Sequence, residues 1–290
     1  MSIPIDSQCL LCHFQRNLEL AETLGSKEQV MDFAHKLMRM YLDAPADAGS
    51  PWFGPQTTQL FYENFGLSPD RYHEEKIQSN RFVMERLPML RETVSTATDP
   101  VLAGLQCAIL GNYLDFSALR GQVSFEKLEE MLRDALKMEL DDRVYRSLCE
   151  DLSRGRKLLY LTDNAGEIGF DRIFAEEIKR KYPQLEITFC VRGGIAQNDA
   201  TREDAMAVGI PFPVIDNGNT VAGTQIDQLS TEAKQALEEA DLILAKGMGN
   251  TETMFGCGYN VYYAFLVKCQ KFVRLFDKPM FTPMLVKERQ

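Results

Sequence analysis

The chain has 290 residues and a mass of 33.0 kDa, which is enough for one large domain or two ordinary ones. Hydrophobic residues make up 45% and charged residues 26%, so a mostly disordered or collagen-like chain is excluded. The 42 acidic and 32 basic residues give a net charge of −10, which disfavours duplex nucleic-acid binding because neutralising phosphates requires clustered lysines and arginines.

The first half of the chain carries apolar residues at helical spacing, as in Val30, Phe33 and Leu37. Segment 43–56 contains three prolines and two glycines and is expected to be a loop. The pattern therefore predicts an all-helical domain over 1–153. Its helices are expected near 10–23, 30–41, 56–66, 71–87, 99–112, 128–136 and 142–154.

The second half alternates between strand and helix patterns after Gly155. Strands that alternate with helices form a mainly parallel sheet covered on both faces, so we predict an α/β domain over 154–290. Strands are expected near 158–161, 185–191, 213–215, 241–246 and 261–269. Helices are expected over 168–181, before Gly209, and after a cap at Ser230 or Thr231.

Polar segments follow three of these strands, where open α/β sheets bind their ligands. Asp163, Asn164 and Asp199 offer hard oxygen atoms suited to Mg²⁺ or Mn²⁺. Lys246 is a mobile cation suited to a phosphate oxygen, and the glycines at 247 and 249 let backbone amides approach an anion. A metal, a lysine and free amides around one spot indicate a phosphoryl-transfer site.

Several competing sites are excluded by sequence. The three histidines lie at 13, 35 and 73, so no histidine-ligated zinc site is expected in the α/β domain. Walker A, G-x-G-x-x-G, an Asp-x-Asp after the first strand and a Cys-x5-Arg loop are all missing from the sequence. Direct attack on phosphorus by a metal-oriented water is then the simplest mechanism. Two structural interpretations stay open: segment 163–166 as a plain turn, and segment 198–204 as a helix start capped by Thr201.

Taken together, these motifs resemble the damage-control phosphatases, metal-dependent enzymes formerly known as domain of unknown function 89. The resemblance rests on segments 163–167, 198–204 and 246–252, in that order, and extends over nearly the whole chain. It implies a three-layer α/β/α Rossmann-like domain beside a helical domain. It also implies hydrolysis of small phosphorylated metabolites, such as sugar phosphates or damaged cofactor precursors, with one divalent cation (Mn²⁺, Mg²⁺, Co²⁺ or Ni²⁺).

The resemblance also assigns roles to individual residues. Asp163, Asn164 and Asp199 match the family's metal ligands, and Glu167 is our candidate to position or deprotonate the attacking water. The residues matching the substrate and phosphate pocket or its roof are Asn198, Lys246, Gly247, Gly249, Asn250, Glu252, Asn112 and Asp115, with Lys76 and Asn80 on an earlier helix. Lys268 matches a late lysine of unassigned role, and a solvated strand-end cation is the alternative. The family often shows Asp-Pro-Tyr where this chain has Asp70-Arg71-Tyr72.

The seven cysteines are odd in number and widely spaced, which indicates reduced thiols in a cytoplasmic protein. Residues 1–6 lack the basic and apolar regions of a secretory signal, so no such signal is expected, and no apolar run reaches the ~18 residues of a membrane helix. Cys9-x-x-Cys12, with Cys107 downstream, resembles the prokaryotic CxxC-containing branch of the family. These three thiols are a candidate second metal site, with His13 adjacent. Reduced core thiols and a redox pair are the alternatives.

We therefore expect a cytoplasmic, metal-dependent phosphomonoester hydrolase whose partner is a small phosphorylated metabolite, with no nucleic acid or membrane partner and an open oligomeric state. Two other functions are kept as alternatives. An S-adenosylmethionine-dependent carboxyl methyltransferase shares the Rossmann-like fold, although Arg192 stands where an acidic residue should end the second strand. A non-catalytic phosphometabolite-binding protein would bind metal and ligand without releasing phosphate.

Overall fold

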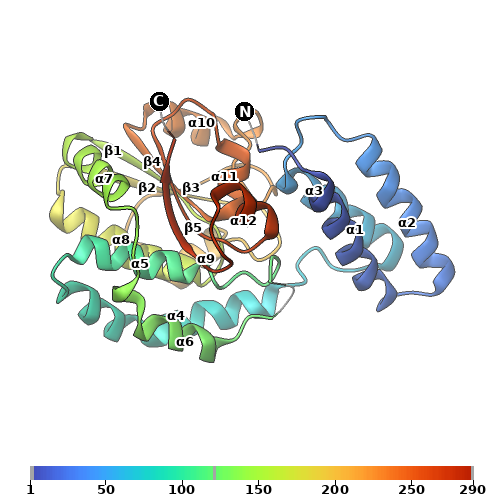
Figure 1. The fold of residues 1–290 in the computed structure, drawn as a ribbon, viewed down its shortest axis with the longest axis horizontal. Helices are drawn as coiled ribbons and strands as arrows, with labels where there is room; N and C mark the ends of the chain where they lie inside the picture. The colour runs from blue at the N-terminus through green and yellow to red at the C-terminus, as the bar shows by residue number, and fades with distance from the viewer. Residues whose placement is uncertain (1–2, 120–121, 289–290) are drawn as a thin grey trace.

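A computed structural model describes residues 3–119 and 122–288 of the chain. Its first three helices form a small unit beside the rest of the molecule (Figure 1). This N-terminal unit has its own core of Ala21, Phe33, Leu37 and Phe61. Its elements are α1 (Ser7–Glu22), α2 (Lys27–Leu42), a 3₁₀ turn (Ser50–Trp52) and α3 (Phe53–Phe65). The predicted 43–56 loop is therefore shorter than expected, because helical structure already begins at Ser50.

The next helices lie along one face of the sheet. They are α4 (His73–Ser95), α5 (Pro100–Gly111), α6 (Phe125–Arg133), a 3₁₀ turn (Ala135–Lys137) and α7 (Asp142–Arg154). The side chains of Asp99, Ser124 and Asp141 cap α5, α6 and α7 by accepting hydrogen bonds from first-turn amides. Helix α4 runs past its predicted end at 87, with Pro88 inside it.

The six-stranded sheet has the order β3-β2-β1-β4-β5-β6, and all neighbouring pairs are parallel except β5 and β6. Its strands are β1 (Lys157–Leu161), β2 (Glu186–Val191), β3 (Val214–Asp216), β4 (Leu242–Lys246), β5 (Val261–Leu266) and β6 (Pro283–Lys287). The second-half helices are α8 (Glu167–Lys181), α9 (Arg202–Ala207), α10 (Thr231–Glu239), α11 (Gly247–Met254) and α12 (Gln270–Phe276), with a 3₁₀ turn at Ile226–Gln228. The sequence predicted neither β6 nor α12. The strand expected over 261–269 ends at Leu266, and the expected loop after Lys246 is helix α11.

Alternate residues of each strand face two different cores, as period-two strand geometry requires. Leu158 and Tyr160 of β1 pack with α4, α5 and α8, whereas Leu159 and Leu161 pack with α10 and α12. The predicted three-layer α/β/α architecture is confirmed (Figure 1). The domain division at residue 153 stays a prediction. The larger core extends across that position, because α4–α7 share it with the strands.

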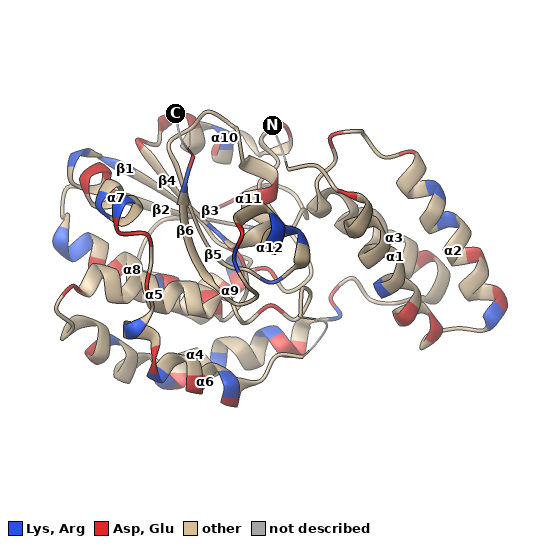
Figure 2. Ribbon diagram, in the orientation of Figure 1, with Lys and Arg blue, Asp and Glu red and all other residues tan. Residues whose placement is uncertain are grey.

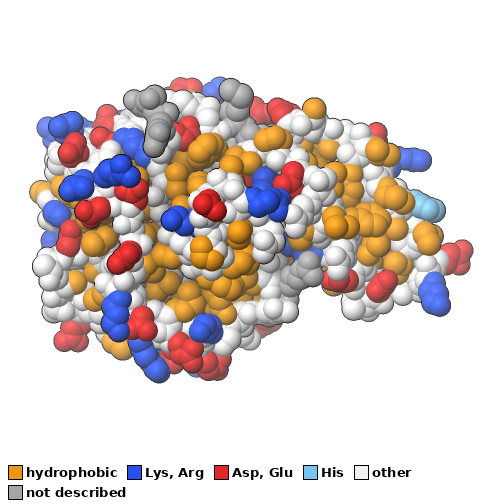
Figure 3. Space-filling model, viewed as in Figure 1, with side chains coloured by type: hydrophobic (Ala, Val, Ile, Leu, Met, Phe, Trp, Pro, Cys, Tyr) orange, Lys and Arg blue, Asp and Glu red, His pale blue; other side chains and the backbone are white. Residues whose placement is uncertain are grey.

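Both signs of charge are distributed along the outer helices, and α4 and α7 each carry lysines or arginines as well as acids (Figure 2). In the space-filling view of the same face, hydrophobic side chains gather near the centre and over the N-terminal unit, with charged side chains between them (Figure 3). Within 3–119 and 122–288, no helix is both long enough and apolar enough to span a bilayer.

The closest helix packing joins α5 to α8, where small residues on α5 face large ones on α8. A Cβ atom at Gly104 would lie 3.0 Å from Phe174 Cα, and one at Gly111 would lie 2.7 Å from Phe170 Cδ2. Glycine at these two positions therefore lets α5 approach the backbone and rings of α8. Because Asn112 follows α5 directly, this packing also places Asn112.

We predict that Gly104→Leu lowers the free energy of unfolding by about 1–3 kcal/mol, because the added side chain overpacks the α5–α8 contact. Urea denaturation measures the change. Ser95→Leu, which adds a similar side chain at the exposed end of α4, is the control and should be nearly neutral. Equal stability of the two variants would contradict the packing described here.

Candidate active site

The loops after β1 and β2 are joined by backbone hydrogen bonds. The amide of Ala165 donates to the Asn198 carbonyl (2.9 Å), and the amide of Ala200 donates to the Asp163 carbonyl (2.7 Å). Asn164 and Asp199 form an isolated antiparallel bridge between the same loops. We call this pairing the loop clamp. It brings Asp163, Asn164 and Asp199 together at the carboxyl edge of the sheet, although they come from two distant segments.

Asp163 is buried and held by amide groups. Its Oδ2 accepts from the side-chain amides of Asn112 (2.9 Å) and Asn164 (2.8 Å). Gly247, with φ of +78°, packs directly against it, since a Cβ there would lie 2.0 Å from Oδ2. The glycine after β4 is therefore needed for the close approach of Asp163.

We call Asp163, Asn164 and Asp199 the floor of the site. Arg192 is a cation that contacts both of its carboxylates. Its Nε donates to Asp199 Oδ2 at 2.6 Å, and its Nη2 lies 3.7 Å from Asp163 Oδ1. Burial, followed by repulsion from Asp199 and Glu167, raises the pKa of Asp163 well above its usual range. Burial also raises the pKa of Asp199 to about 6, although Arg192 opposes the shift.

The floor fits a divalent cation. Asp163 and Asp199 supply two carboxylates and Asn164 an amide oxygen, which is the hard donor set that Mg²⁺ and Mn²⁺ prefer. The raised pKa values of the two aspartates show that the single charge of Arg192 does not offset their burial and repulsion. A cation with two positive charges would relieve that repulsion.

The structure corrects the predicted role of Lys246. Its ammonium group donates to Glu167 Oε1 (2.7 Å), Asp171 Oδ1 (2.7 Å) and the Ala108 carbonyl (2.9 Å), and its side chain is fully buried. Burial alone would lower the pKa of Lys246, but attraction by Asp171 and Glu167 raises it above its usual value. Lys246 is therefore a fixed countercharge inside the protein and does not reach the cleft as a mobile phosphate-binding cation.

The predicted role of Glu167 is corrected for the same reason. Its carboxylate is fully buried and accepts from Lys246, from the Asn112 amide (2.9 Å), and from both the backbone and side chain of Asn164 (3.2 and 2.7 Å). The side chains of all of these partners are buried. Glu167 orients Asn164 and Asn112 and is not placed to act on a water in the cleft.

Three predicted pocket asparagines are buried supports of the floor. Asn198 donates to Asn164 Oδ1 at 2.8 Å, and Asn112 also accepts from the Leu266 amide at 3.1 Å. Asn250 donates to the carbonyls of Thr162 (3.0 Å) and Lys246 (2.7 Å), which ties the ends of β1 and β4 together. These side chains hold the loops that carry the ligands.

Asp115, Gly249 and Glu252 line the cleft, and their role in binding substrate stays a prediction. Asp115 pairs with Lys268 at 2.5 Å, and Glu252 pairs with Lys271 at 3.1 Å. Lys268 is buried and also donates to the Asn112 carbonyl, so the alternative of a solvated strand-end cation is wrong.

The loop after β2 is supported by helices α9 and α4. The structural interpretation of 198–204 is partly confirmed, because Thr201 and Asp204 form a capping box at the start of α9. Asp204 also forms an ion pair with Lys76 through Oδ2 and accepts a hydrogen bond from the Asn80 side-chain amide through Oδ1, each at 2.8 Å. Asn80 in turn accepts from the Gly166 amide, so α4 supports both loops.

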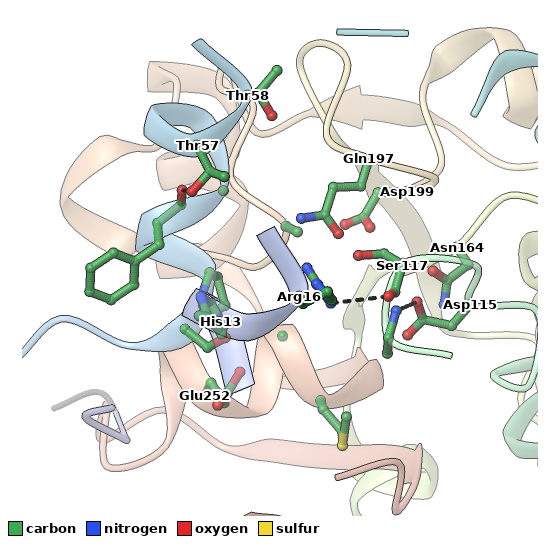
Figure 4. Close-up of a pocket in the computed structure, with 18 of the residues that line it drawn as sticks. His13, Arg16, Thr57, Thr58, Asp115, Ser117, Asn164, Gln197, Asp199 and Glu252 are labelled. Atoms are coloured by element: carbon green, nitrogen blue, oxygen red, sulfur yellow. Dashed lines mark hydrogen bonds between the residues drawn. The ribbon is translucent and has the colours of Figure 1, made fainter. Parts of the chain in front are cut away.

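The cleft lies between the floor and the N-terminal unit (Figure 4). It encloses about 890 Å³ of space, part of it open to solvent. The rest of the lining includes residues that the motifs do not indicate: Arg16, Asn17, Thr57 and Thr58 from the N-terminal unit, Arg71 from the turn before α4, and Gln197 from the loop after β2. Gln197 directly precedes the Asn198 motif and has φ of +56°, an unusual conformation for a residue other than glycine. The helical wall residues carried no comparable signal in the sequence.

The structure does not bring the three cysteines of the candidate second metal site together. Cys107 is buried in the core on α5, whereas Cys9 and Cys12 lie on α1 in the N-terminal unit. Within 3–119 and 122–288, no three Cys, His, Asp or Glu side chains are grouped so as to hold a metal ion. Burial raises the pKa of Cys9 to about 11, which favours its thiol form.

Comparison with known proteins identifies the family. The model of the damage-control phosphatase ARMT1-like domain matches residues 5–282. The chain belongs to this family. The family member called damage-control phosphatase in Archaeoglobus fulgidus is 37% identical over 220 residues, which is 73% of this chain and 74% of that protein. Damage-control phosphatase PH1575 of Pyrococcus horikoshii is 30% identical over 286 residues, 95% of each chain.

The fold agrees with that of a solved family member. The crystal structure of PH1575, described as a DUF89 family protein, superimposes over the full length of both chains with a TM-score of 0.81 and 25% identity. The resemblance inferred from the three motifs is thereby confirmed. Membership of the CxxC branch stays a prediction.

We predict that Lys246→Met lowers the free energy of unfolding by about 3–5 kcal/mol, because it leaves Glu167 and Asp171 buried without their countercharge. Urea denaturation measures the loss. Lys36→Met, at a solvent-exposed ion pair with Asp32, is the control and should change stability little. If Lys246→Met were as stable as the control and only raised KM for a phosphoester, Lys246 would be a cleft residue after all.

Proposed function

We propose that the protein is a metal-dependent phosphatase that hydrolyses small phosphorylated metabolites. Family membership and the names of the relatives support the phosphatase activity. The observation that carries the metal dependence is the loop clamp, which gathers two buried carboxylates and one amide oxygen at the floor of a cleft. Such a cluster suits a hard divalent cation bridging to a phosphate.

Asp163, Asn164 and Asp199 would hold the cation, with Mn²⁺, Mg²⁺, Co²⁺ and Ni²⁺ as the candidate ions. When bound, the cation supplies positive charge that polarises the phosphoryl group and lowers the pKa of a nearby water toward neutrality. The remaining contributions come from the chain itself. Asn112 and Asn164 fix the Oδ2 atom of Asp163, and Arg192 fixes Asp199, so the acceptor atoms keep their arrangement.

A buried support behind the floor maintains this arrangement. Lys246 neutralises Glu167, and Glu167 fixes the backbone and side chain of Asn164. The support keeps the ligand side chains in place before a substrate arrives, so binding does not have to order them. The N-terminal unit covers the cleft from the other side and contributes polar groups toward the substrate.

We predict that Asp163→Asn lowers kcat for p-nitrophenyl phosphate, measured with Mn²⁺, by roughly 100-fold or more, since it removes one charged group from the reacting centre. Its melting temperature should not fall, because the variant removes repulsion between buried carboxylates. Asp134→Asn, at the exposed C-terminal cap of α6, is the control and should keep full activity.

Four results would count against this function. Full activity of Asp163→Asn, or of the wild type in excess EDTA, would refute the metal-dependent mechanism. Binding of phosphoesters without phosphate release would instead indicate a non-catalytic binding protein. Saturable binding of S-adenosylmethionine in calorimetry would favour the methyltransferase.

A further inference from the structure

Buried cations around the cleft are neutralised by carboxylates. Each of the following pairs is between 2.5 and 3.1 Å: Lys76 with Asp204, Arg192 with Asp199, Lys246 with Glu167 and Asp171, Lys268 with Asp115, and Lys271 with Glu252. This pairing is expected, because a buried charge without a partner is strongly destabilising. Arg16 and Arg71, on the opposite wall of the cleft, differ in that no carboxylate of the described residues pairs with either.

Arg16 and Arg71 are half-buried and held in place by neutral groups. Arg16 donates from Nη1 to the Ser117 carbonyl at 3.1 Å. The guanidinium of Arg71 lies 4.9 Å from the ring centroid of Tyr72 and 5.8 Å from that of Phe61. In the described ranges, neither arginine has a carboxylate within ion-pair distance. Both guanidinium groups are therefore oriented while their charges remain available.

The two arginines occupy different parts of the cleft. Arg16 is joined to the floor through Ser117, whose amide donates to Asn198 at 3.2 Å, and Asn198 donates in turn to Asn164 (Figure 4). Arg71 also borders a smaller recess with Thr58, Phe61 and Gln197, which none of the floor residues lines. Arg16 is thus on the side of the reacting group, and Arg71 lies farther along the cleft.

The other wall side chains are polar and uncharged. Thr57, Thr58, Asn17 and Gln197 line the same space and suit hydroxyl groups of a small ligand. His13 does not add a third positive charge, because burial, followed by repulsion from Arg16, lowers its pKa to about 3. Its Nε2 is hydrogen-bonded to Ser50 Oγ at 2.7 Å.

We infer that the cleft selects phosphomonoesters that carry a second negatively charged group, with Arg16 beside the reacting phosphate and Arg71 binding the second group. The inference rests on the proposed function and names its substrate class: small phosphorylated acids or bisphosphates. A planar guanidinium held by aromatic rings presents two parallel donors, which match a carboxylate or a phosphate.

Matched ligands test the inference. 3-Phosphoglycerate and glycerol 3-phosphate have the same carbon skeleton and differ by a carboxylate in place of a hydroxymethyl group. Fructose 1,6-bisphosphate and fructose 6-phosphate make the corresponding comparison for a second phosphate. Dissociation constants are measured by titration calorimetry without a divalent cation, so the readout does not depend on turnover. Hydrolysis of p-nitrophenyl phosphate is measured on the same preparations.

In the wild type, the more charged member of at least one pair should bind roughly tenfold more tightly, as expected for one charge-assisted hydrogen-bonded pair. Arg71→Met should bring that ratio close to one, and Arg71→Lys should restore part of it. Arg16→Met should weaken inorganic phosphate and all four ligands. Arg81→Met, at an exposed arginine of α4, is the control and should match the wild type.

Ratios near one for both pairs in the wild type, or an unchanged ratio in Arg71→Met, would overturn the inference. The proposed function and the substrate class can be refuted independently. If p-nitrophenyl phosphate is hydrolysed but no preference for the more charged ligand appears, the protein is a phosphatase and the substrate class is wrong. If the preference appears without hydrolysis, the roles of Arg16 and Arg71 in binding are supported and the enzymatic function is wrong.

Discussion

Two carboxylates that repel each other, Asp163 and Asp199, are held together at the edge of the sheet by the loop clamp. The rest of the site depends on this constraint. Asn112, Asn164 and Arg192 stabilise the two carboxylates directly, and the Lys246–Glu167 pair fixes Asn164 from behind. A fold that buries negative charge in this way is ready for a cation, since the cation removes the repulsion that burial creates.

The N-terminal unit completes the cleft, and few polar contacts join it to the sheet-containing part. The Ile3 amide donates to the Glu252 carbonyl at 2.7 Å, Arg16 donates to the Ser117 carbonyl, and Arg274 pairs with Asp6 at 2.8 Å. This arrangement suggests two separate roles under the proposed function. The strand ends would provide the reacting centre, and the helices of the N-terminal unit would provide the groups that face the remainder of a substrate.

Much of the fold could be predicted from the sequence, because apolar runs such as 158–161 and 241–246 are long enough to indicate buried strands. Helix α11 was missed because it begins at Gly247 and contains a second glycine, and glycine disfavours helix. Strand β6 is as long as β1 but mostly half-buried, so its pattern is weak. The proximity of Asp163, Asn164 and Asp199 was predictable because these residues follow neighbouring parallel strands whose ends share one edge.

Side-chain direction was harder to predict than residue type. Lys246 lies two residues after Leu244, so period-two geometry turns it toward α5 and α8, away from the cleft; the motif alone suggested a phosphate contact. Arg16 lies on α1, and one sequence does not tell which helix face meets the site. Arg71 lies in the turn that precedes α4, where the sequence carries no sign of a cleft contact. In the sequence, Arg71 is distinguished only by standing where the family often has the proline of Asp-Pro-Tyr. The structure shows that it lines the cleft.

Binding of a cation by the three floor residues is tested most simply in crystals soaked with Mn²⁺, where the ion is located by its anomalous scattering. We expect one strong peak in contact with oxygen atoms of Asp163, Asn164 and Asp199. A peak only at another place, such as beside Cys9 and Cys12, or side chains of the three residues separated by solvent alone, would contradict it.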